Sequence, residues 1–535
     1  MRFLGSTRMG QALLWLSCNA TLYMCRANIS VAVTYMYPGE VSGPCALHTR
    51  LKFTAPAGDD AIEGRLLSAF YVGYSVSQIP GGYLAARFGA QTVLASCVAV
   101  WTAATALSAV FGDRPSILFA LRVVVGMAEG PNYPCQVQLL SLWIPKSERA
   151  TAWSLALAGE SLGTVIALLA GPVIASRLGW REVFWFSAAA SAGWLLLFLT
   201  LGARSPADHP RIRAAERAWI QASRPPPPPR PPRPPWCGFA KSRPYLATVF
   251  CHFCYNWSFY LCLSWTTAFF KQTYHLDSIK LGLVSILPYV TNFGVMMFAG
   301  RGADMLERSG GLGPTGVRRL FNSVSMFGGA ACMLALAWVV PPVAPVPANV
   351  SLPSLEASAV ARAAATPPPP PPPLTPSDVP ADGWVPAAAM LTLALGFLAV
   401  ACATGYNLNF VDLSPRHSQL IYAISNSLAS LPGVAASALG GEVLQITHQN
   451  WALIFRCCAA ILTIGAVAFA CCSSAEEQDF ETVARSGCCA VVPSAQVAAD
   501  CSVGGPGHEG HRQGEEVLGS TDASTTRSLN AKLLS

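Results

Sequence analysis

Long apolar blocks alternate with short polar segments along most of this chain. An α-helix that crosses a bilayer needs about 20 apolar residues. Windows of that kind can be marked twelve times, near residues 11–36, 65–85, 91–111, 117–140, 151–174, 182–202, 247–270, 280–300, 319–340, 385–410, 419–442 and 451–472. The pattern therefore predicts an all-α membrane protein with twelve transmembrane helices.

The composition of the 535 residues supports this prediction. Only 12% of them are charged and 52% are hydrophobic, whereas soluble domains carry about 25% charged residues. Most of the 18 cysteines fall inside the apolar windows, where we expect them to pack as small hydrophobic residues. We therefore expect the lipid bilayer and small solutes as partners, with no metal, no cofactor and no nucleic acid.

A long polar segment divides the windows into two sets of six. The predicted parts are a short N-terminus (1–10), an N-terminal six-helix bundle (11–202), a linker (203–246), a C-terminal six-helix bundle (247–472) that contains a Pro-rich outer loop (343–384), and a disordered tail (473–535). Two such halves are typical of transporters built from repeats, which bind substrate between the repeats near the bilayer midplane.

Basic residues are concentrated on one predicted side of the membrane. The linker holds nine Arg or Lys residues, and the short loops near Arg87, 146–149, 301–319 and Arg416 are also basic. The positive-inside rule therefore places these segments and both termini in the cytoplasm. Because the N-terminus runs almost directly into the first window, we expect the plasma membrane or an endomembrane vesicle rather than a plastid.

Two segments have low complexity, SRPPPPPRPPRPPW at 223–236 and the proline run 367–373. Both are predicted to be extended spacers. The first has interleaved arginines, so docking of a proline-reading domain is an alternative. Asn349 begins an N-glycosylation sequon on the predicted outer face.

Arg26, Arg122 and Glu129 lie inside apolar windows of the first half. An ionisable group at membrane depth costs about 3 kcal/mol on insertion scales and usually faces a cavity or a partner. Arg122 and Glu129 are seven residues apart, roughly 10 Å along one helix face, which is too far for a direct pair. Two guanidinium groups against one acid favour an anionic ligand, with Glu129 as the residue that couples transport to an ion.

A structural alternative exists for these charges. One arginine would pair with Glu129, and the other would bind backbone carbonyls freed where Pro131 breaks its helix. The sequence leaves this alternative open.

The second half contributes mostly neutral polar groups to its apolar windows. Asn256, Asn409 and Asn426 are candidate substrate ligands, although asparagines in spans equally often form interhelical hydrogen bonds. His252 lies near the start of its window and is interpreted as a solvated cap.

Candidate gating residues lie at the predicted cytoplasmic ends of the helices. Gly82 lies near the end of the second window and Arg87 just after it, and Asp304 occupies the corresponding place in the second half. Arg416 belongs to the segment Asp412–Arg416, which we interpret as a conformational latch. The correspondence between the halves indicates internal duplication.

Several motifs together resemble one family. They are EGRLLSAFYVGYSVSQIPGGYLAARFG, RVVVGMAEGPNYP, LWIPKSERATAWSLALAGESLGT, GWREVFWF, NLNFVDLSPRHS and ISNSLASLPG. In order and spacing they are similar to signatures of the anion:cation symporter branch of the major facilitator superfamily, with HFCYNWSFYLCLSW most similar to plant plastid anion transporters. The resemblance implies the major facilitator fold.

The resemblance also implies roles for individual residues. Arg26, Arg122, Glu129 and Asn426 match positions that contact the anion or take part in coupling in that family. The chain departs from vesicular glutamate transporters at Tyr255 and Leu67, from bacterial sugar-acid symporters at Cys25, and from the usual loop signature at Ala86. The departures at Tyr255 and Leu67 argue against glutamate as the substrate, and the departure at Cys25 argues against two-proton coupling.

We therefore expect a secondary active transporter that moves small anions, inorganic phosphate or an organic anion, by alternating access. The coupling would be to Na⁺, H⁺ or membrane potential. The alternative is a receptor or scaffold that transports nothing and acts through its Pro-rich linker and tail. An enzyme is not expected, because no nucleophile–base or metal constellation is recognisable in the sequence.

Overall fold

The computed structural model describes residues 3, 5–36, 59–223, 234–276, 278–341, 382–447, 449–480 and 483. The predicted sequon at Asn349, the proline run 367–373, residues 224–233 of the first Pro-rich segment and the tail beyond residue 483 lie outside the described residues.

The described residues of the first half form seven main helices. They are α1 (Thr7–Met36), α2 (Asp59–Phe88), α3 (Ala90–Phe111), α4 (Pro115–Glu129), α5 (Asn132–Trp143), α6 (Arg149–Arg177) and α7 (Trp180–Leu201). A short 3-10 turn, Lys146–Glu148, joins α5 to α6. The linker contributes two shorter helices, α8 (Ala214–Ala222) and α9 (Trp236–Lys241).

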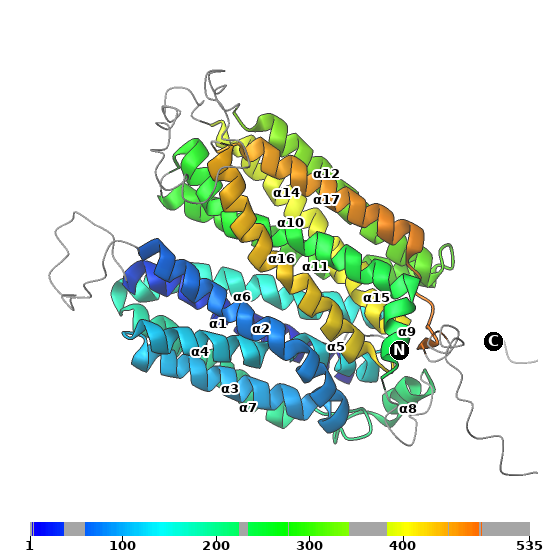
Figure 1. The fold of residues 1–535 in the computed structure, drawn as a ribbon. Helices are drawn as coiled ribbons and strands as arrows, with labels where there is room; N and C mark the ends of the chain where they lie inside the picture. Colours follow the sequence, from blue (N-terminus) through cyan, green and yellow to red (C-terminus); the bar gives the residue numbers. More distant parts are fainter. Residues whose placement is uncertain are drawn as a thin grey trace, which may run out of the picture. The chain divides into compact units, whose positions relative to one another are not determined.

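The second half follows the same pattern. Its helices are α10 (Arg243–Tyr274), α11 (Ser278–Arg308), α12 (Pro314–Val339), α14 (Trp384–Thr404), α15 (Tyr406–Leu413), α16 (Ser418–Ile446) and α17 (Trp451–Cys472). In Figure 1 the first helix group (α1–α7) lies below the second helix group (α10–α17).

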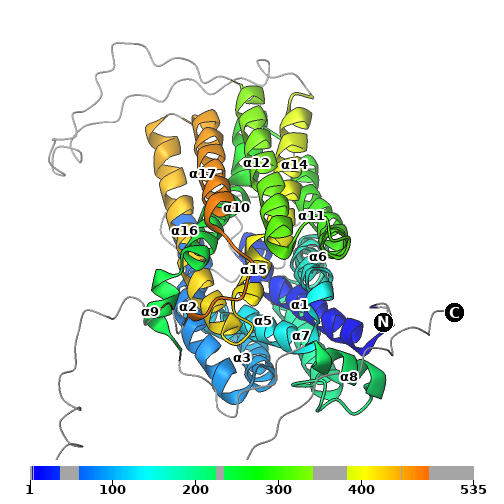
Figure 2. The same ribbon diagram turned by 90° about the vertical axis from the view of Figure 1, so that its right-hand side faces the viewer.

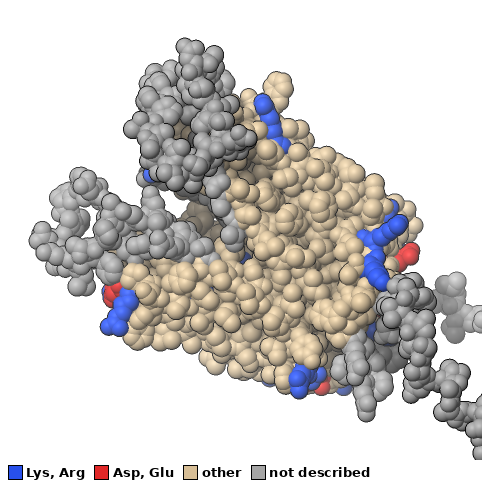
Figure 3. All heavy atoms as spheres, in the orientation of Figure 1, with Lys and Arg blue, Asp and Glu red and all other residues tan. Residues whose placement is uncertain are grey.

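Each of the twelve predicted windows coincides with one helix or with two consecutive helices. The window 117–140 is divided into α4 and α5, and the window 385–410 into α14 and α15. Among the described residues, seven helical stretches are long and apolar enough by length and composition to cross a membrane. Figure 3 shows charged side chains only near the ends of the visible surface, with an uncharged band between them. The chain is an integral, multi-pass membrane protein.

The break between α4 and α5 lies in the middle of a predicted span. Pro131 cannot donate a backbone hydrogen bond and its ring crowds the preceding turn, so α4 ends at Glu129 and α5 begins at Asn132. Gly130 is packed against α2, because a Cβ added there would lie 2.0 Å from the Ser77 hydroxyl. The break therefore leaves Glu129 at a helix end inside the bundle.

Glycines allow the helices of the first group to approach closely. A Cβ added to Gly159 of α6 would lie 2.0 Å from the carbonyl oxygen of Leu16 in α1, and one on Gly126 of α4 would lie 2.0 Å from that of Phe70 in α2. In a bilayer helices associate through packing rather than the hydrophobic effect, so small residues at contacts are decisive.

The two helix groups meet along a few helices only. The main contacts pair α6 with α11 and α16 with both α2 and α5. Figure 2 views the molecule from the end that carries α8, α9 and α15, which is called the linker end below. In this view α6 lies next to α11, and α16 lies next to α2. The exact boundaries of the two predicted bundles stay a prediction.

One contact between the groups at the linker end uses a helix N-terminus. The Asp304 carboxylate of α11 accepts hydrogen bonds from the backbone amides of Ala150 (3.2 Å) and Thr151 (2.8 Å) and from the Thr151 hydroxyl (2.5 Å). A carboxylate at this place satisfies free amides of α6 and complements the helix dipole. Gly300 lets α11 approach, since a Cβ there would lie 2.2 Å from the Ala150 carbonyl oxygen.

A second contact at the linker end is an ion-pair cluster. Asp412 of α15 pairs with Arg149 of α6 at 3.4 Å and with Arg318 of α12 at 2.9 Å, and Glu307 lies 3.6 Å from Arg318. Asp412, Arg149 and Arg318 are all buried. The cluster joins four helices, α6 of the first group with α11, α12 and α15 of the second.

The linker and the start of the tail also pack at this end. Arg8 of α1 is fully buried and pairs with Glu148 and with Glu216 of α8, each at 2.9 Å. Phe480 stacks edge-on against Phe239 of α9 at 5.0 Å. The predicted disorder of the tail therefore does not extend to residues 473–480, because the Phe480 side chain is buried against α9.

We expect Gly159→Ala to destabilise the protein strongly, because the new methyl group would collide with backbone of α1 and force α1 and α6 apart. The melting temperature in detergent should fall by several degrees. Gly193→Ala in α7 is the matched control, since a Cβ there meets nothing within 4 Å, and it should be neutral or slightly stabilising. Equal melting temperatures for the two variants would contradict this account.

We expect Asp304→Ala to open the linker end. The amides of Ala150 and Thr151 lose their acceptor, at a cost of about 1 kcal/mol typical of a lost helix cap, and their hydrogen–deuterium exchange in nanodiscs should accelerate severalfold. The control is Asp113→Ala, which removes an exposed acid paired with exposed Arg181. Unchanged exchange at the start of α6 would contradict the role of Asp304 in closing the linker end.

Candidate functional site

The charged centre of the first helix group is an ion pair between α1 and α4. Arg26 donates from Nε and Nη2 to Oε2 of Glu129, at 3.2 and 3.1 Å. Glu129 is fully buried, and the Arg26 side chain keeps 12% of its surface exposed. Because α4 ends at Glu129, its carboxylate can turn towards the neighbouring helix α1.

Aromatic rings surround the Arg26 guanidinium. Its carbon lies 4.6 Å from the ring centres of Tyr23 and Phe70 and 4.9 Å from that of Tyr74. Each ring face attracts a cation, more strongly where water is excluded. Phe70 and Tyr74 stack on each other at 5.5 Å on α2, so α2 holds the guanidinium against Glu129.

Arg122 has a different environment. It donates to the carbonyl oxygens of Cys25 (3.2 Å) and Arg26 (3.3 Å) on α1, and it forms no ion pair within the described residues. Its Nε is buried without a hydrogen-bond partner there. This resembles the structural alternative for one arginine, except that the carbonyls belong to α1 and not to the break at Pro131.

The sequence reasoning missed a second acid at membrane depth. Glu160 of α6 is half-buried, and its Oε1 accepts a hydrogen bond from the Tyr133 hydroxyl at 2.6 Å. The rule that singled out Arg122, an ionisable residue inside an apolar window, would also have found Glu160. With two acids and two arginines, the expected surplus positive charge exists only when one acid is neutral.

The three candidate asparagines fall into different surroundings. Asn426 of α16 donates to the Tyr74 hydroxyl at 3.0 Å and so connects the second helix group to the ring that covers Arg26. Asn256 donates to the Ala429 carbonyl oxygen at 2.8 Å, and Asn409 to the Thr248 hydroxyl at 2.9 Å. These last two bonds are interhelical hydrogen bonds within the second group.

His252 is buried, and its Nδ1 lies 3.0 Å from the Ser425 hydroxyl. The interpretation as a solvated cap is therefore wrong, because α10 begins nine residues earlier, at Arg243.

The four predicted gating residues are not brought together. Gly82 packs against α16, where a Cβ would lie 3.0 Å from the Gln419 carbonyl oxygen, and Asp304 caps α6 as described. Arg87 and Arg416 are exposed and make no contact between the groups in the described part of the chain. In the segment Asp412–Arg416, it is Asp412 that forms ion pairs across the two groups, and its role as a conformational latch stays a prediction.

An apolar groove lies away from this centre, between α11 and α12. Val295, Phe298 and Leu320 are among its lining residues, and none of those residues is charged. Phe298 is 76% exposed on the face expected to meet lipid. The groove therefore offers nothing that would recognise an anion.

The chain is similar to known membrane proteins over most of its length. Residues 16–368 match the family model described as Major Facilitator Superfamily. Sialin from Homo sapiens is 28% identical over 483 residues, which are 86% of this chain and 88% of sialin. The probable anion transporter 6, chloroplastic, from Arabidopsis thaliana is 27% identical over 421 residues, 78% of this chain and 73% of the relative.

Solved structures support the fold. The proton:xylose symporter XylE superposes with a TM-score of 0.62 at 12% identity, covering 89% of this chain and 98% of XylE. Family and relatives are membrane transporters and not enzymes, and they do not support the receptor alternative. The chain belongs to the Major Facilitator Superfamily, and its relatives identify the anion:cation symporter branch expected from its motifs.

Proposed function

We propose that this transporter moves a small anion across the membrane by alternating access, with Arg26 and Arg122 as its positive centre. The observation that carries the proposal is the buried guanidinium of Arg122, which has no acidic partner among the described residues and one nitrogen without a hydrogen bond. A buried charge without a partner is costly. An anion bound nearby would supply the missing negative charge.

Arg26 is the member of this centre that an anion can reach first. It retains partial exposure, whereas the Arg122 side chain is almost fully buried. A guanidinium recognises carboxylate and phosphate through two parallel hydrogen bonds. The anion therefore contacts Arg26, while Arg122 adds positive charge from the neighbouring helix α4.

Glu129 competes with the anion for Arg26. When no anion is present, the carboxylate occupies Nε and Nη2 of the guanidinium. An arriving anion shares or replaces that bond. Glu129 thus keeps Arg26 neutralised between transport events.

The Tyr74–Asn426 hydrogen bond provides a route from the anion to the second helix group. Tyr74 lies over Arg26, and Asn426 belongs to α16. A shift of Arg26 on anion binding changes this bond between the groups. Alternating access then requires the linker-end contacts of Asp304 and Asp412 to open, with the linker end facing the cytoplasm as the basic loops predict.

The names of the relatives fit anion transport but do not select one anion. One is named an anion transporter and another sialin. Inorganic phosphate or an organic anion is therefore proposed as substrate, with Na⁺ or H⁺ as coupling ion. Docking of a proline-reading domain at 223–236 stays a prediction.

We expect Arg26→Ala and Arg122→Ala each to reduce transport at least about thirtyfold, since loss of one partner of a buried charge pair costs roughly 2–5 kcal/mol. The measurement is counterflow in proteoliposomes with labelled phosphate, ascorbate, glutamate and N-acetylneuraminate. Arg26→Lys keeps the charge without the planar fork and should retain part of the activity.

The control for these variants is Arg114→Ala, at the exposed start of α4. It should transport normally because it lies outside the charged centre. Counterflow at wild-type rates in both Arg26→Ala and Arg122→Ala would refute the proposed anion site.

A further inference from the structure

Glu160 is an acid at membrane depth that the proposed anion site does not use. It lies eleven residues after the start of α6 at Arg149, about 16 Å along the helix from the linker end. It is half-buried and forms no ion pair with any described residue. A carboxylate in this position needs a counter-charge or a proton.

The surroundings of Glu160 supply hydrogen bonds rather than a salt bridge. Tyr133 donates to Oε1 at 2.6 Å, and Tyr23 of α1 also interacts with the carboxylate. Asp304, the nearest acid of α11, is engaged at the start of α6. Groups within electrostatic range on the other packed helices are Arg26, Tyr74, Tyr255, Tyr260, Cys402 and Tyr422. Of these, only Arg26 is charged at neutral pH.

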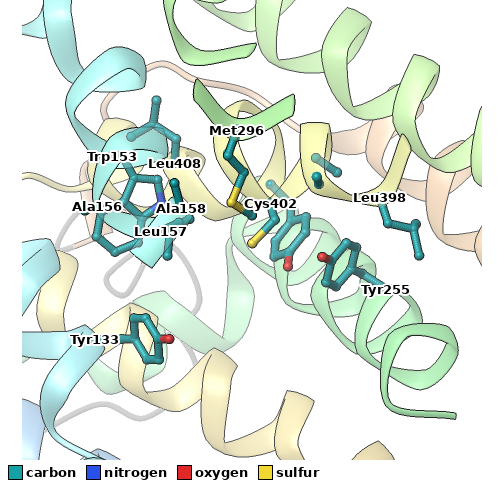
Figure 4. Packing of buried hydrophobic residues seen from close by; sticks show 14 of the residues in the cluster. Tyr133, Trp153, Ala156, Leu157, Ala158, Tyr255, Met296, Leu398, Cys402 and Leu408 are labelled. Atoms are coloured by element: carbon teal, nitrogen blue, oxygen red, sulfur yellow. The ribbon is translucent and has the colours of Figure 1, made fainter. Parts of the chain in front are cut away.

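Glu160 also lies where the two helix groups meet. The Tyr133 ring is 6.3 Å from that of Tyr422 on α16. Tyr255 of α10 is close enough to interact electrostatically with Glu160. Figure 4 shows Tyr133 beside Ala156 and Leu157 of α6, one turn before Glu160, and Tyr255 next to Cys402 on the facing helices. Rearrangement of the groups therefore changes the environment of the Glu160 carboxylate.

We propose that Glu160 carries the coupling proton, and that one proton moves with each monovalent anion. This rests on the proposed anion transport and names its driving ion. The proton passes from water to a Glu160 carboxylate oxygen on one side of the membrane, forming the neutral acid. It returns to water on the other side after the anion leaves.

Charge balance explains why the two movements are linked. With Glu160 ionised and no anion, the charges of Arg26, Arg122, Glu129 and Glu160 sum to zero. With Glu160 protonated and one monovalent anion bound, the charges of these side chains and the anion together again sum to zero. Each of the mixed states, anion without proton or proton without anion, leaves one net charge at membrane depth, which is disfavoured in a low-dielectric interior.

Glu129 is less suited to this role. Its carboxylate is fully buried and already neutralised by two hydrogen bonds from Arg26. Glu160 is partly exposed and bound only by phenols, so a proton can reach it without first breaking an ion pair. The coupling role predicted for Glu129 is thus better filled by Glu160.

The test uses proteoliposomes that contain the full-length protein and the pH dye pyranine, with the four labelled probes named above. The wild type should accumulate a transported probe along an inward proton gradient, and probe entry should acidify the lumen. Glu160→Gln mimics the protonated acid, so it should retain counterflow but lose gradient-driven accumulation and acidification by at least tenfold. Glu182→Gln, at an exposed position of α7, should behave as the wild type.

Four results would overturn the proposal. One is wild-type acidification by Glu160→Gln, and another is loss of probe binding by this variant, which would make Glu160 a substrate ligand. Absence of counterflow in the wild type would overturn the proposed function and this inference with it. Counterflow without acidification in the wild type would refute the role of Glu160 as proton carrier and leave the proposed anion transport intact.

A second variant covers the case in which Glu160→Gln does not fold. Tyr133→Phe removes one hydrogen bond from the carboxylate and keeps the ring. It should shift the pH of half-maximal uptake by roughly one unit, since a hydrogen bond of this kind contributes about 1–2 kcal/mol. An unchanged pH profile would contradict the role of Glu160.

Discussion

The structure depends on neutralising charges placed at membrane depth. Arg26 is central to this, because its guanidinium binds the Glu129 carboxylate on one side and three aromatic rings on the others. In a medium of low dielectric such interactions are strong, and their absence is correspondingly costly. Three helices, α1, α2 and α4, are therefore held in one arrangement by a single side chain.

That arrangement requires the backbone to come very close. Gly126 and Gly130 allow α2 to lie against α4, and this contact brings Phe70 and Tyr74 over Arg26. The helix break at Pro131 then leaves Glu129 free to face α1. The close packing of α2 against α4 and the ion pair of Arg26 with Glu129 therefore depend on each other. Neither would position the site without the other.

The two helix groups are closed at the linker end by contacts of different chemistry. On one side Asp304 caps α6, whereas on the other Gly82 packs α2 against α16, and Ala86 stands where the second half has Asp304. Opening the α6–α11 contact breaks the hydrogen bonds of a charged cap, whereas opening the α2–α16 contact breaks neutral hydrogen bonds, such as the one from Asn426 to Tyr74, and loses packing. The two contacts therefore differ in the kind of hydrogen bond that must break.

Apolar windows by themselves determined the helical membrane fold, because the length and hydrophobicity of a span follow directly from bilayer thickness. The same reasoning located Arg26, Arg122 and Glu129, since a charge inside such a window is unusual whatever the tertiary structure. Only the tertiary structure decided which arginine pairs with Glu129, that Asp412 rather than Arg416 forms ion pairs between the groups, and that Tyr133 binds Glu160. Those choices depend on how helices distant in sequence are rotated and spaced against one another, and neither hydrophobic periodicity nor residue spacing records that.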